Sequence, residues 1–195
     1  YWKIAMENKR VLITGGNSGI GKIAAIELAK KGASLVLACR PGDKTEVALA
    51  EINAVATQEA INLPVDLACL ESVRNLAREF LARYDALDVL INNAGVFPSR
   101  KKLTEDGFEM QIGVNHLSHF LLTELLIDVL KSTASSRVVT VSSMLHKKGE
   151  MDFASFRGEK KYSSQKAYAQ SKLANVLFSM ELAKRLADND VTSNC

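Results

Sequence analysis

Tyr168 and Lys172 lie four positions apart in a stretch whose composition favours a helix. On an α-helix such positions share one face, with Cβ atoms about 5–6 Å apart. A free phenol loses its proton only at about pH 10, so it is a poor proton acceptor at neutral pH. A neighbouring ammonium stabilises phenolate, and the pair could then pass a proton to or from an alcohol oxygen. The same spacing often arises by chance, so the rest of the chain must support this reading.

A glycine-rich stretch at residues 14–21 (TGGNSGIG) follows a short apolar run and precedes an amphipathic segment. Glycines between a strand and a helix let the backbone approach a pyrophosphate, whose charge is met by amide N–H groups. Glycines also occur in ordinary turns, but this context indicates dinucleotide binding. The stretch lacks the Gly-Lys-Ser/Thr ending of a P-loop, which argues against a phosphate-transfer enzyme. The expected binding residues are Gly15, Asn17, Ser18, Gly19, Ile20 and Gly21.

Short apolar runs alternate with longer amphipathic segments along the chain, which is typical of βαβ units on a parallel sheet. We expect one α/β domain over residues 1–195, a doubly wound Rossmann-type parallel sheet of six strands flanked by helices. Strands are expected over 10–13, 34–39, 60–65, 87–91 and 137–141, with a sixth from Val191. Helices are expected over 19–30, 43–57, 70–83, 108–131 and 162–186, and a polar loop or lid over 144–161.

The ends of the second and third expected strands carry residues suited to a nucleotide. Arg40 follows the second strand, where a carboxylate would select NAD; its planar donors suit a 2′-phosphate and favour NADP. The alternative is a solvated surface arginine. Lys22 and Lys44 could add positive charge. Asp66 could accept a hydrogen bond from an adenine amino group, or could cap the following helix.

The turn at residues 92–95 (NNAG) and the pair Ser142-Ser143 follow the fourth and fifth strands. Amides and glycine could simply form a turn. In a doubly wound fold, however, the carboxyl ends of parallel strands meet at the edge where ligands bind. We therefore expect these residues to gather beside the glycine turn and Arg40.

Taken in order, these motifs resemble the short-chain dehydrogenase/reductases over nearly the whole chain. The resemblance rests on TGxxxGxG (14–21), NNAG (92–95), Asn115, a serine after the fifth strand, and YxxxK (168–172). The stretches GVNHL (113–117) and SKLANVLF (171–178) look like the retinol dehydrogenase branch. That resemblance implies an NADP-dependent oxidoreductase, with NAD less suited, acting on a retinol- or retinal-like or other apolar alcohol or aldehyde.

The resemblance also implies roles for individual residues. Tyr168 would be the general acid/base, and Lys172 would assist it and bind the nicotinamide ribose. Ser143 would hydrogen-bond the substrate oxygen, with Ser142 as the alternative, and Asn115 would hold a water that links Lys172 to solvent. The residues expected at the cofactor, besides the glycine turn and Arg40, are Asp66, Leu67, Asn93, Ala94, Gly95, Tyr168 and Lys172.

Composition narrows the other possibilities. With 47% hydrophobic and 24% charged residues the chain is typical of a globular protein, and a net charge of +3 does not favour nucleic acid. Three scattered cysteines suggest a reducing compartment, so we expect an intracellular protein, cytoplasmic or associated with the endoplasmic reticulum. His116 and His119 lie three apart without a third ligand, so we expect helix-packing histidines and no metal.

The chain begins with Tyr1 and ends just after the expected sixth strand. Members of the resembled family continue with a substrate-covering segment and a seventh strand, so we expect a fragment. Membrane association through a missing segment, and a homo-oligomer, are both compatible with it. The competing hypothesis is a catalytically silent nucleotide-binding or interaction module.

Overall fold

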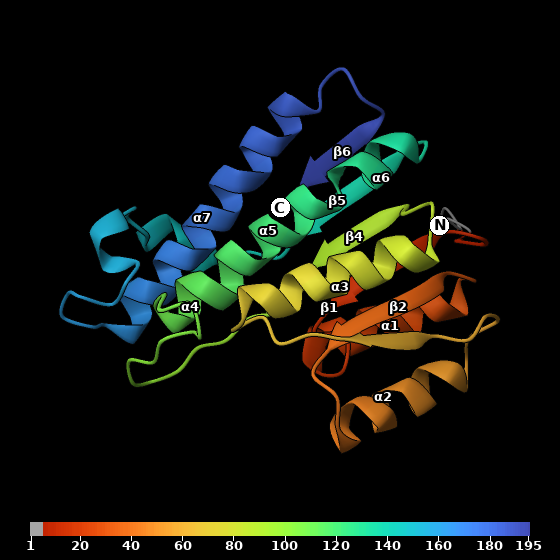
Figure 1. Ribbon diagram of the computed structural model, residues 1–195, viewed down its shortest axis with the longest axis horizontal. Coiled ribbons are helices and arrows are strands. Elements are labelled where there is room, and N and C mark those ends of the chain that lie inside the picture. The colour runs from red at the N-terminus through yellow and green to blue at the C-terminus, as the bar shows by residue number, and fades with distance from the viewer. Residues whose placement is uncertain (1–5) are drawn as a thin grey trace.

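The computed structural model, in which residues 6–195 are described, forms one six-stranded parallel sheet with helices packed on it (Figure 1). The sheet has the order β3-β2-β1-β4-β5-β6. The chain first builds outward from β1 to β3 and then restarts on the other side of β1, as in a doubly wound Rossmann-type fold. The predicted fold class is confirmed. The strands are β1 (Arg10–Thr14), β2 (Ser34–Cys39), β3 (Ile61–Pro64), β4 (Val89–Asn92), β5 (Ser136–Thr140) and β6 (Val191–Asn194).

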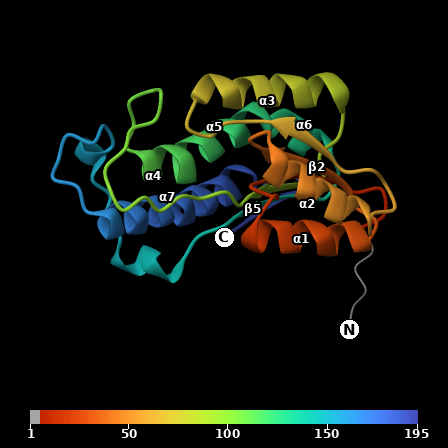
Figure 2. The same cartoon turned by 90° about the horizontal axis from the view of Figure 1, so that it is seen from below.

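The helices that connect these strands lie on both faces of the sheet, and Figure 2 shows α1 and α3 on opposite sides. The longer helices are α1 (Gly19–Lys30), α2 (Asp43–Asn53), α3 (Leu70–Arg83), α5 (Ser118–Leu125) and α7 (Ser164–Arg185). The shorter pieces are α4 (Met110–Ile112), a π-turn η1 (Gly113–Leu117), α6 (Ile127–Ser132) and two 3-10 turns, η2 (Met144–Lys148) and η3 (Phe153–Ser155). Among the described residues, no helix is both long and apolar enough to cross a membrane.

The sheet separates two hydrophobic clusters, because successive side chains of a strand point to opposite faces. In β2, Leu35 and Leu37 pack in the cluster beneath α1 and α2, where Ala25, Ala29 and Ile52 complete it. The intervening Val36 and Ala38 belong to the other cluster. That second cluster is larger and is covered by α3, α5, α6 and α7, through residues such as Phe80, Leu122, Leu130 and Phe178.

The helix expected over 108–131 is not continuous, which corrects the sequence prediction. It consists of α4, the π-turn η1, α5 and α6. In the π-turn the N–H of Ser118 bonds to the carbonyl of Gly113, five residues back. A second interruption falls at Leu126, whose N–H is shared between the carbonyls of Leu122 and Thr123. Apolar periodicity does not reveal either break, because each changes the hydrogen-bond step over only a few residues inside a continuous apolar stretch.

Several other boundaries differ from the sequence prediction by a few residues, and side-chain hydrogen bonds explain two of them. Helix α2 ends at Asn53 rather than residue 57, because the Asn53 side chain bonds both the N–H and the carbonyl of Ala60, at 2.7 and 3.2 Å. Strand β4 begins at Val89 rather than Leu87. The N–H of Leu87 bonds instead to Thr133 Oγ1, at 3.0 Å, outside the strand ladder.

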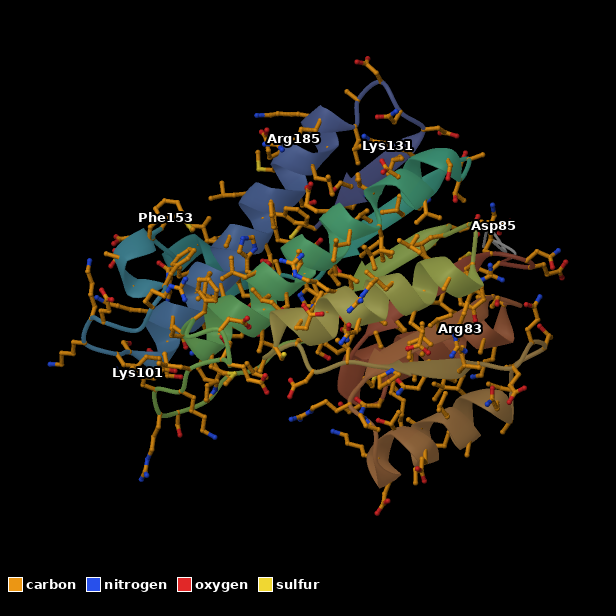
Figure 3. The ribbon with its side chains drawn as sticks, viewed as in Figure 1. Arg83, Asp85, Lys101, Lys131, Phe153 and Arg185 are labelled. Atoms are coloured by element: carbon orange, nitrogen blue, oxygen red, sulfur yellow. The ribbon has the colours of Figure 1, made fainter. Side chains whose placement is uncertain are left out.

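The segment expected as a loop over 144–161 contains η2 and η3 and is fastened to the chain that follows β4. Lys101 Nζ donates to the carbonyl of Gly158, at 2.8 Å, and the N–H of Glu109 donates to the carbonyl of Phe156, at 2.7 Å. Figure 3 shows Lys101 and Phe153 at the same end of the molecule. The two segments therefore form one ordered end of the domain.

Candidate active site

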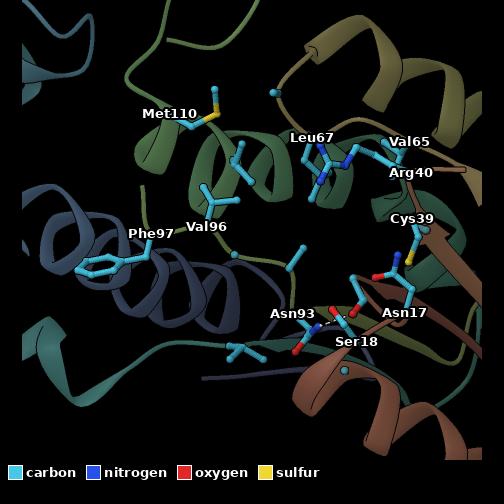
Figure 4. A pocket seen from close by; sticks show the side chains of 18 of the residues that line it. Asn17, Ser18, Cys39, Arg40, Val65, Leu67, Asn93, Val96, Phe97 and Met110 are labelled. Carbon is cyan, nitrogen blue, oxygen red and sulfur yellow. Dashed lines mark hydrogen bonds between the residues drawn. The ribbon is translucent and has the colours of Figure 1, made fainter. Parts of the chain in front are cut away.

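A cleft of about 1120 Å³ lies at the carboxyl ends of the strands. Figure 4 shows Arg40 and Asn17 toward one end of it, and Phe97 and Met110 toward the other. Most of the residues predicted from the sequence line this cleft. They are Gly15, Asn17, Ser18, Ile20, Gly21, Arg40, Asp66, Leu67, Asn93, Ala94, Gly95, Ser143, Tyr168 and Lys172. Gly19 and Asn115 are not among the lining residues.

The glycine turn joins β1 to α1 in a conformation that demands glycine. Gly15 has φ +66°, a left-handed value that side chains disfavour. A Cβ on Gly21 would collide with Asn93 Nδ2 and with the carbonyl oxygen of Gly15. Asn93 Nδ2 in turn donates to the carbonyl of Thr14 at 2.8 Å. The turn thus packs directly against the 92–95 turn of the neighbouring strand.

The end of β2 presents positive charge to the cleft. Arg40 is exposed there, and Lys44 also lines the wall. Lys22, in contrast, pairs with Glu51 at 2.7 Å and is not a lining residue. Asn17 Nδ2 donates to Thr45 Oγ1 at 2.8 Å, and that hydroxyl donates to the carbonyl of Arg40 at 2.7 Å. The glycine turn and the arginine-bearing end of β2 are therefore linked.

Asp66 lines the cleft, and one of its carboxylate oxygens accepts from the N–H of Ala68 at 2.9 Å. The helix that follows starts after Cys69, so Asp66 does not occupy its N-cap. A carboxylate oxygen accepts more than one hydrogen bond. The local bond therefore leaves Asp66 able to accept from an adenine amino group, which stays a prediction.

Tyr168 and Lys172 lie on α7, one turn apart, with Lys172 Nζ 5.6 Å from the centre of the Tyr168 ring. Lys172 Nζ donates to the carbonyl of Val141 at 2.9 Å, and burial lowers the pKa of its ammonium. Phe97 meets the Tyr168 ring edge-on, with centroids 4.8 Å apart and planes at 79°. These contacts fix the directions of the phenol and the ammonium within the same cleft.

Ser142 and Ser143, which follow β5, both line the cleft. Their hydroxyl groups differ in their hydrogen bonds to the rest of the chain. Ser142 Oγ donates to the carbonyl of Lys172 at 2.8 Å. Ser143 Oγ accepts a long hydrogen bond, 3.3 Å, from the N–H of Leu145, and its own proton has no partner among the described residues. This arrangement favours Ser143 as the donor to a substrate oxygen.

Asn115 lies behind the cleft wall, in the π-turn, and is fully buried. Its side chain bonds the N–H and the carbonyl of Val96, at 2.7 and 3.1 Å, and also donates to Ser171 Oγ at 3.0 Å. Its backbone carbonyl accepts from His119 Nδ1 at 3.1 Å. A water held by Asn115 would have to hydrogen-bond to atoms of Asn115 that these contacts leave available. That water stays a prediction.

Sequence reasoning missed two groups of residues around the site. Thr14 and His119 form a buried hydrogen bond of 2.8 Å across 105 positions, which no local pattern signals. The apolar wall beyond Tyr168 was also missed, although the apolar residues that follow NNAG could have suggested part of it. Its members include Val96, Phe97, Pro98, Met110 and Val114. Across residues 6–195, no three His, Cys, Asp or Glu side chains gather to hold a metal ion.

A family model described as short chain dehydrogenase matches residues 9–195. The chain therefore belongs to the short-chain dehydrogenase family of oxidoreductases. Within that family it resembles retinol dehydrogenases. It is 46% identical to human retinol dehydrogenase 13 over 194 residues, which cover 98% of this chain and 59% of that protein. It is 49% identical to mouse retinol dehydrogenase 11 over 191 residues, covering 97% of this chain and 60% of that protein.

Solved structures share the fold. A protein from Mycobacterium paratuberculosis is 41% identical, with a TM-score of 0.85, and the match covers 99% of this chain and 70% of that one. An NADPH complex of a short chain dehydrogenase from Escherichia coli has a TM-score of 0.80 at 24% identity, covering 100% and 78%. The chain spans 59–60% of the length of the two retinol dehydrogenases.

Proposed function

We propose that this chain forms the dinucleotide-binding and proton-transfer part of an NADP-dependent oxidoreductase that interconverts an alcohol and a carbonyl. The observation that carries the proposal is that Ser143, Tyr168 and Lys172 line one cleft with the glycine turn and Arg40. The similarity to retinol dehydrogenases supports a small apolar substrate of the retinol or retinal kind.

The residues at one end of the cleft fit a dinucleotide. Helix α1 begins at the cleft without a side-chain cap, and its first turn has no acidic residue, so its amide N–H groups suit a pyrophosphate. Arg40 and Lys44 supply donors and charge for a 2′-phosphate. Together these features favour NADP over NAD.

The proton chemistry is assigned to three side chains. When bound, the nicotinamide supplies or accepts hydride. In reduction the Tyr168 hydroxyl gives its proton to the carbonyl oxygen, and in oxidation the Tyr168 phenolate takes the proton of the alcohol. The Lys172 ammonium stabilises the phenolate form in both directions. The free Ser143 proton hydrogen-bonds the same substrate oxygen and polarises it. In this scheme the Val141 carbonyl holds the Lys172 ammonium near the phenol.

The apolar wall supports the substrate class. Phe97, Met110 and Val114 line the cleft, and an apolar chain bound against them would gain free energy because its surface would be removed from water. Phe97 also shields one edge of the Tyr168 ring. An apolar aldehyde is therefore a better probe than a charged one.

Mixing the chain with NADPH and an apolar aldehyde, and following the loss of reduced-nicotinamide absorbance, tests the proposal. Turnover supports it. Tight NADPH binding without turnover favours the silent nucleotide-binding module, and failure to bind NADPH or NADH contradicts both hypotheses. The same assay with the longer protein would show whether the remaining part is needed for turnover.

The thiols support an intracellular setting. Cys39, Cys69 and Cys195 are all free, which fits a reducing compartment. We accordingly place the protein inside the cell, in the cytoplasm or at the endoplasmic reticulum. Membrane association and a homo-oligomer stay predictions.

A further inference from the structure

His119 is a buried histidine that the proposed proton chemistry does not use, and only 1% of its surface is exposed. Its two ring nitrogens have different partners. Nδ1 lies 3.1 Å from the carbonyl oxygen of Asn115, which can only accept, so Nδ1 carries the proton. In the neutral ring Nε2 is then an acceptor, and the Thr14 hydroxyl donates to it at 2.8 Å.

The Thr14 hydroxyl is fully occupied in this arrangement. Two acceptors lie near its proton, His119 Nε2 at 2.8 Å and the carbonyl oxygen of Ile91 at 3.4 Å, and the shorter contact assigns the proton to His119. Its oxygen accepts from the N–H groups of Asn93 and Ala94, at 2.9 and 3.0 Å. One proton and two lone pairs are all that a hydroxyl offers. The direction of every hydrogen bond in the cluster is therefore determined by the Asn115 carbonyl at one end.

Asn93 and Ala94 begin a turn that ends at Val96, and Asn115 holds this second end. The Asn115 side chain bonds both the N–H and the carbonyl of Val96. Asn115 also donates to Ser171 Oγ, which donates to the carbonyl of Tyr168 at 2.8 Å. A continuous set of hydrogen bonds thus runs from the start of the glycine turn to the helix that carries the phenol.

We propose that His119 is a positioning residue: in its Nδ1–H form it holds the Asn93–Val96 turn against the π-turn at Asn115, and so fixes the cleft wall where a dinucleotide would lie. The cleft-wall part of this inference rests on the proposed function. The hydrogen-bond directions do not depend on it.

A second proton on the ring would break the arrangement. Nε2–H would then face a Thr14 oxygen that already accepts twice, and would compete with the Asn93 and Ala94 amides for it. The Asn93 N–H also bonds the carbonyl of Ile91 at 3.0 Å, whereas the Ala94 N–H bonds only Thr14 among the described residues and would lose its partner. The charged or titratable groups that face the ring are Lys172 of α7 and His116 of the π-turn, and both disfavour that proton. Burial acts in the same direction.

Nitrogen NMR of the imidazole in the unaltered chain tests the hydrogen-bond directions. We expect His119 at about neutral pH to show a protonated Nδ1 and an unprotonated Nε2. The opposite tautomer, or a rapidly exchanging mixture of the two, would overturn the inference. This measurement needs neither a variant nor a ligand.

Two substitutions test the positioning role. His119→Phe keeps an aromatic ring but no hydrogen bonds, and should weaken NADPH binding about tenfold or more. It should also shift the amide resonances of Asn93, Ala94 and Val96. His119→Gln keeps one donor and one acceptor, and should bind NADPH within about threefold of the original chain.

Ser136→Ala is the matched control. Ser136 is equally buried at the start of β5, and its hydroxyl donates to the carbonyl of Leu130 at 2.7 Å, away from the cleft. Its loss should lower stability but leave NADPH affinity within about threefold. Normal NADPH affinity and unshifted amides in His119→Phe, or a Gln variant as weak as the Phe variant, would refute the positioning role.

Thr14→Val and Thr14→Ser serve if His119→Phe does not fold. The valine variant should reproduce the loss of affinity and the serine variant should restore it; equal affinities would refute the role. If the unaltered chain binds no NADPH, the proposed function fails, and the tautomer and the amide shifts alone decide the inference about His119.

Discussion

Tyr168 is the residue on which the proposed chemistry depends. Within residues 6–195 its hydroxyl has no protein hydrogen-bond partner, so it is free to meet a substrate oxygen. Tyr168→Phe should lower turnover of an apolar aldehyde about 10²–10⁴-fold, because the general acid is lost, and should change NADPH affinity far less than turnover. Steady-state kinetics and a binding titration measure the two effects. Tyr84→Phe, which alters a tyrosine packed on Phe80, is the control and should turn over normally.

Arg40 decides the choice of cofactor in the proposal. Arg40→Ala should weaken NADPH about 10–100-fold, because a charge-assisted contact to the 2′-phosphate is lost, while NADH affinity changes little. Isothermal titration of both nucleotides checks this. Arg74→Ala removes an exposed arginine from α3, outside the cleft, and should change neither affinity. Equal losses for both nucleotides in Arg40→Ala would contradict the assignment.

Among the elements, the turn between β1 and α1 has the least room for change. Gly21→Ala would force a Cβ against Asn93 Nδ2 and the carbonyl of Gly15, so we expect unfolding to become easier by about 1–3 kcal/mol. Urea denaturation measures the change. Lys22→Ala, at the next position, removes only a surface ion pair with Glu51 and should cost less than about 1 kcal/mol. A Gly21→Ala variant as stable as the original would mean that the two turns can move apart.

Hydrophobic periodicity predicted the six strands and most of the helices, because the buried strands are short apolar runs and the helices are amphipathic. It did not predict elements whose ends depend on side-chain hydrogen bonds. Asn53 closes α2 by bonding Ala60, and the Leu87 amide is taken by Thr133. Nor did it predict the π-turn, whose hydrogen-bond step leaves no trace in composition. Where the end of a helix or strand depends on one polar side chain, it can be located only in the three-dimensional structure.

The sequence predicted those parts of the site that consist of local motifs. It did not predict contacts between residues that are far apart in the chain. The glycine turn, the 92–95 turn and YxxxK could each be read from a few neighbouring residues. His119 was expected only to pack in a helix, and its link to Thr14 spans 105 positions. The apolar wall likewise draws on the segment before α4, on α4 itself and on the π-turn, which only the folded chain brings together.

For the molecule as a whole, His119 predicts how stability changes with acidity. Burial lowers its pKa from 6.5 to about 4, so between these values the unfolded chain binds a proton that the folded chain does not. Stability contributed by neutral His119 is present above about pH 6.5, and about 3 kcal/mol of it is lost as the pH falls to about 4. Burial raises the pKa of Glu109, which acts in the opposite direction.

The variant His119→Gln isolates the histidine, because Glu109 is common to both proteins. Urea unfolding at about pH 7 and about pH 4.5 should show a smaller loss of stability in the variant than in the original chain. The difference between the two losses should be roughly 2–3 kcal/mol. Parallel stability curves would show that His119 takes up its proton without cost in the folded state.

The position of β1 matters for the chain as it leaves the ribosome. Val11, Leu12 and Ile13 of this strand are completely buried, and they pair on one side with β2 and on the other with β4. Translation proceeds from the N-terminus, so β2 and β3 can join β1 early, whereas β4 is made only after α3. Until then the nascent sheet has an apolar unpaired edge at its future centre, where chaperone capture or aggregation competes with folding.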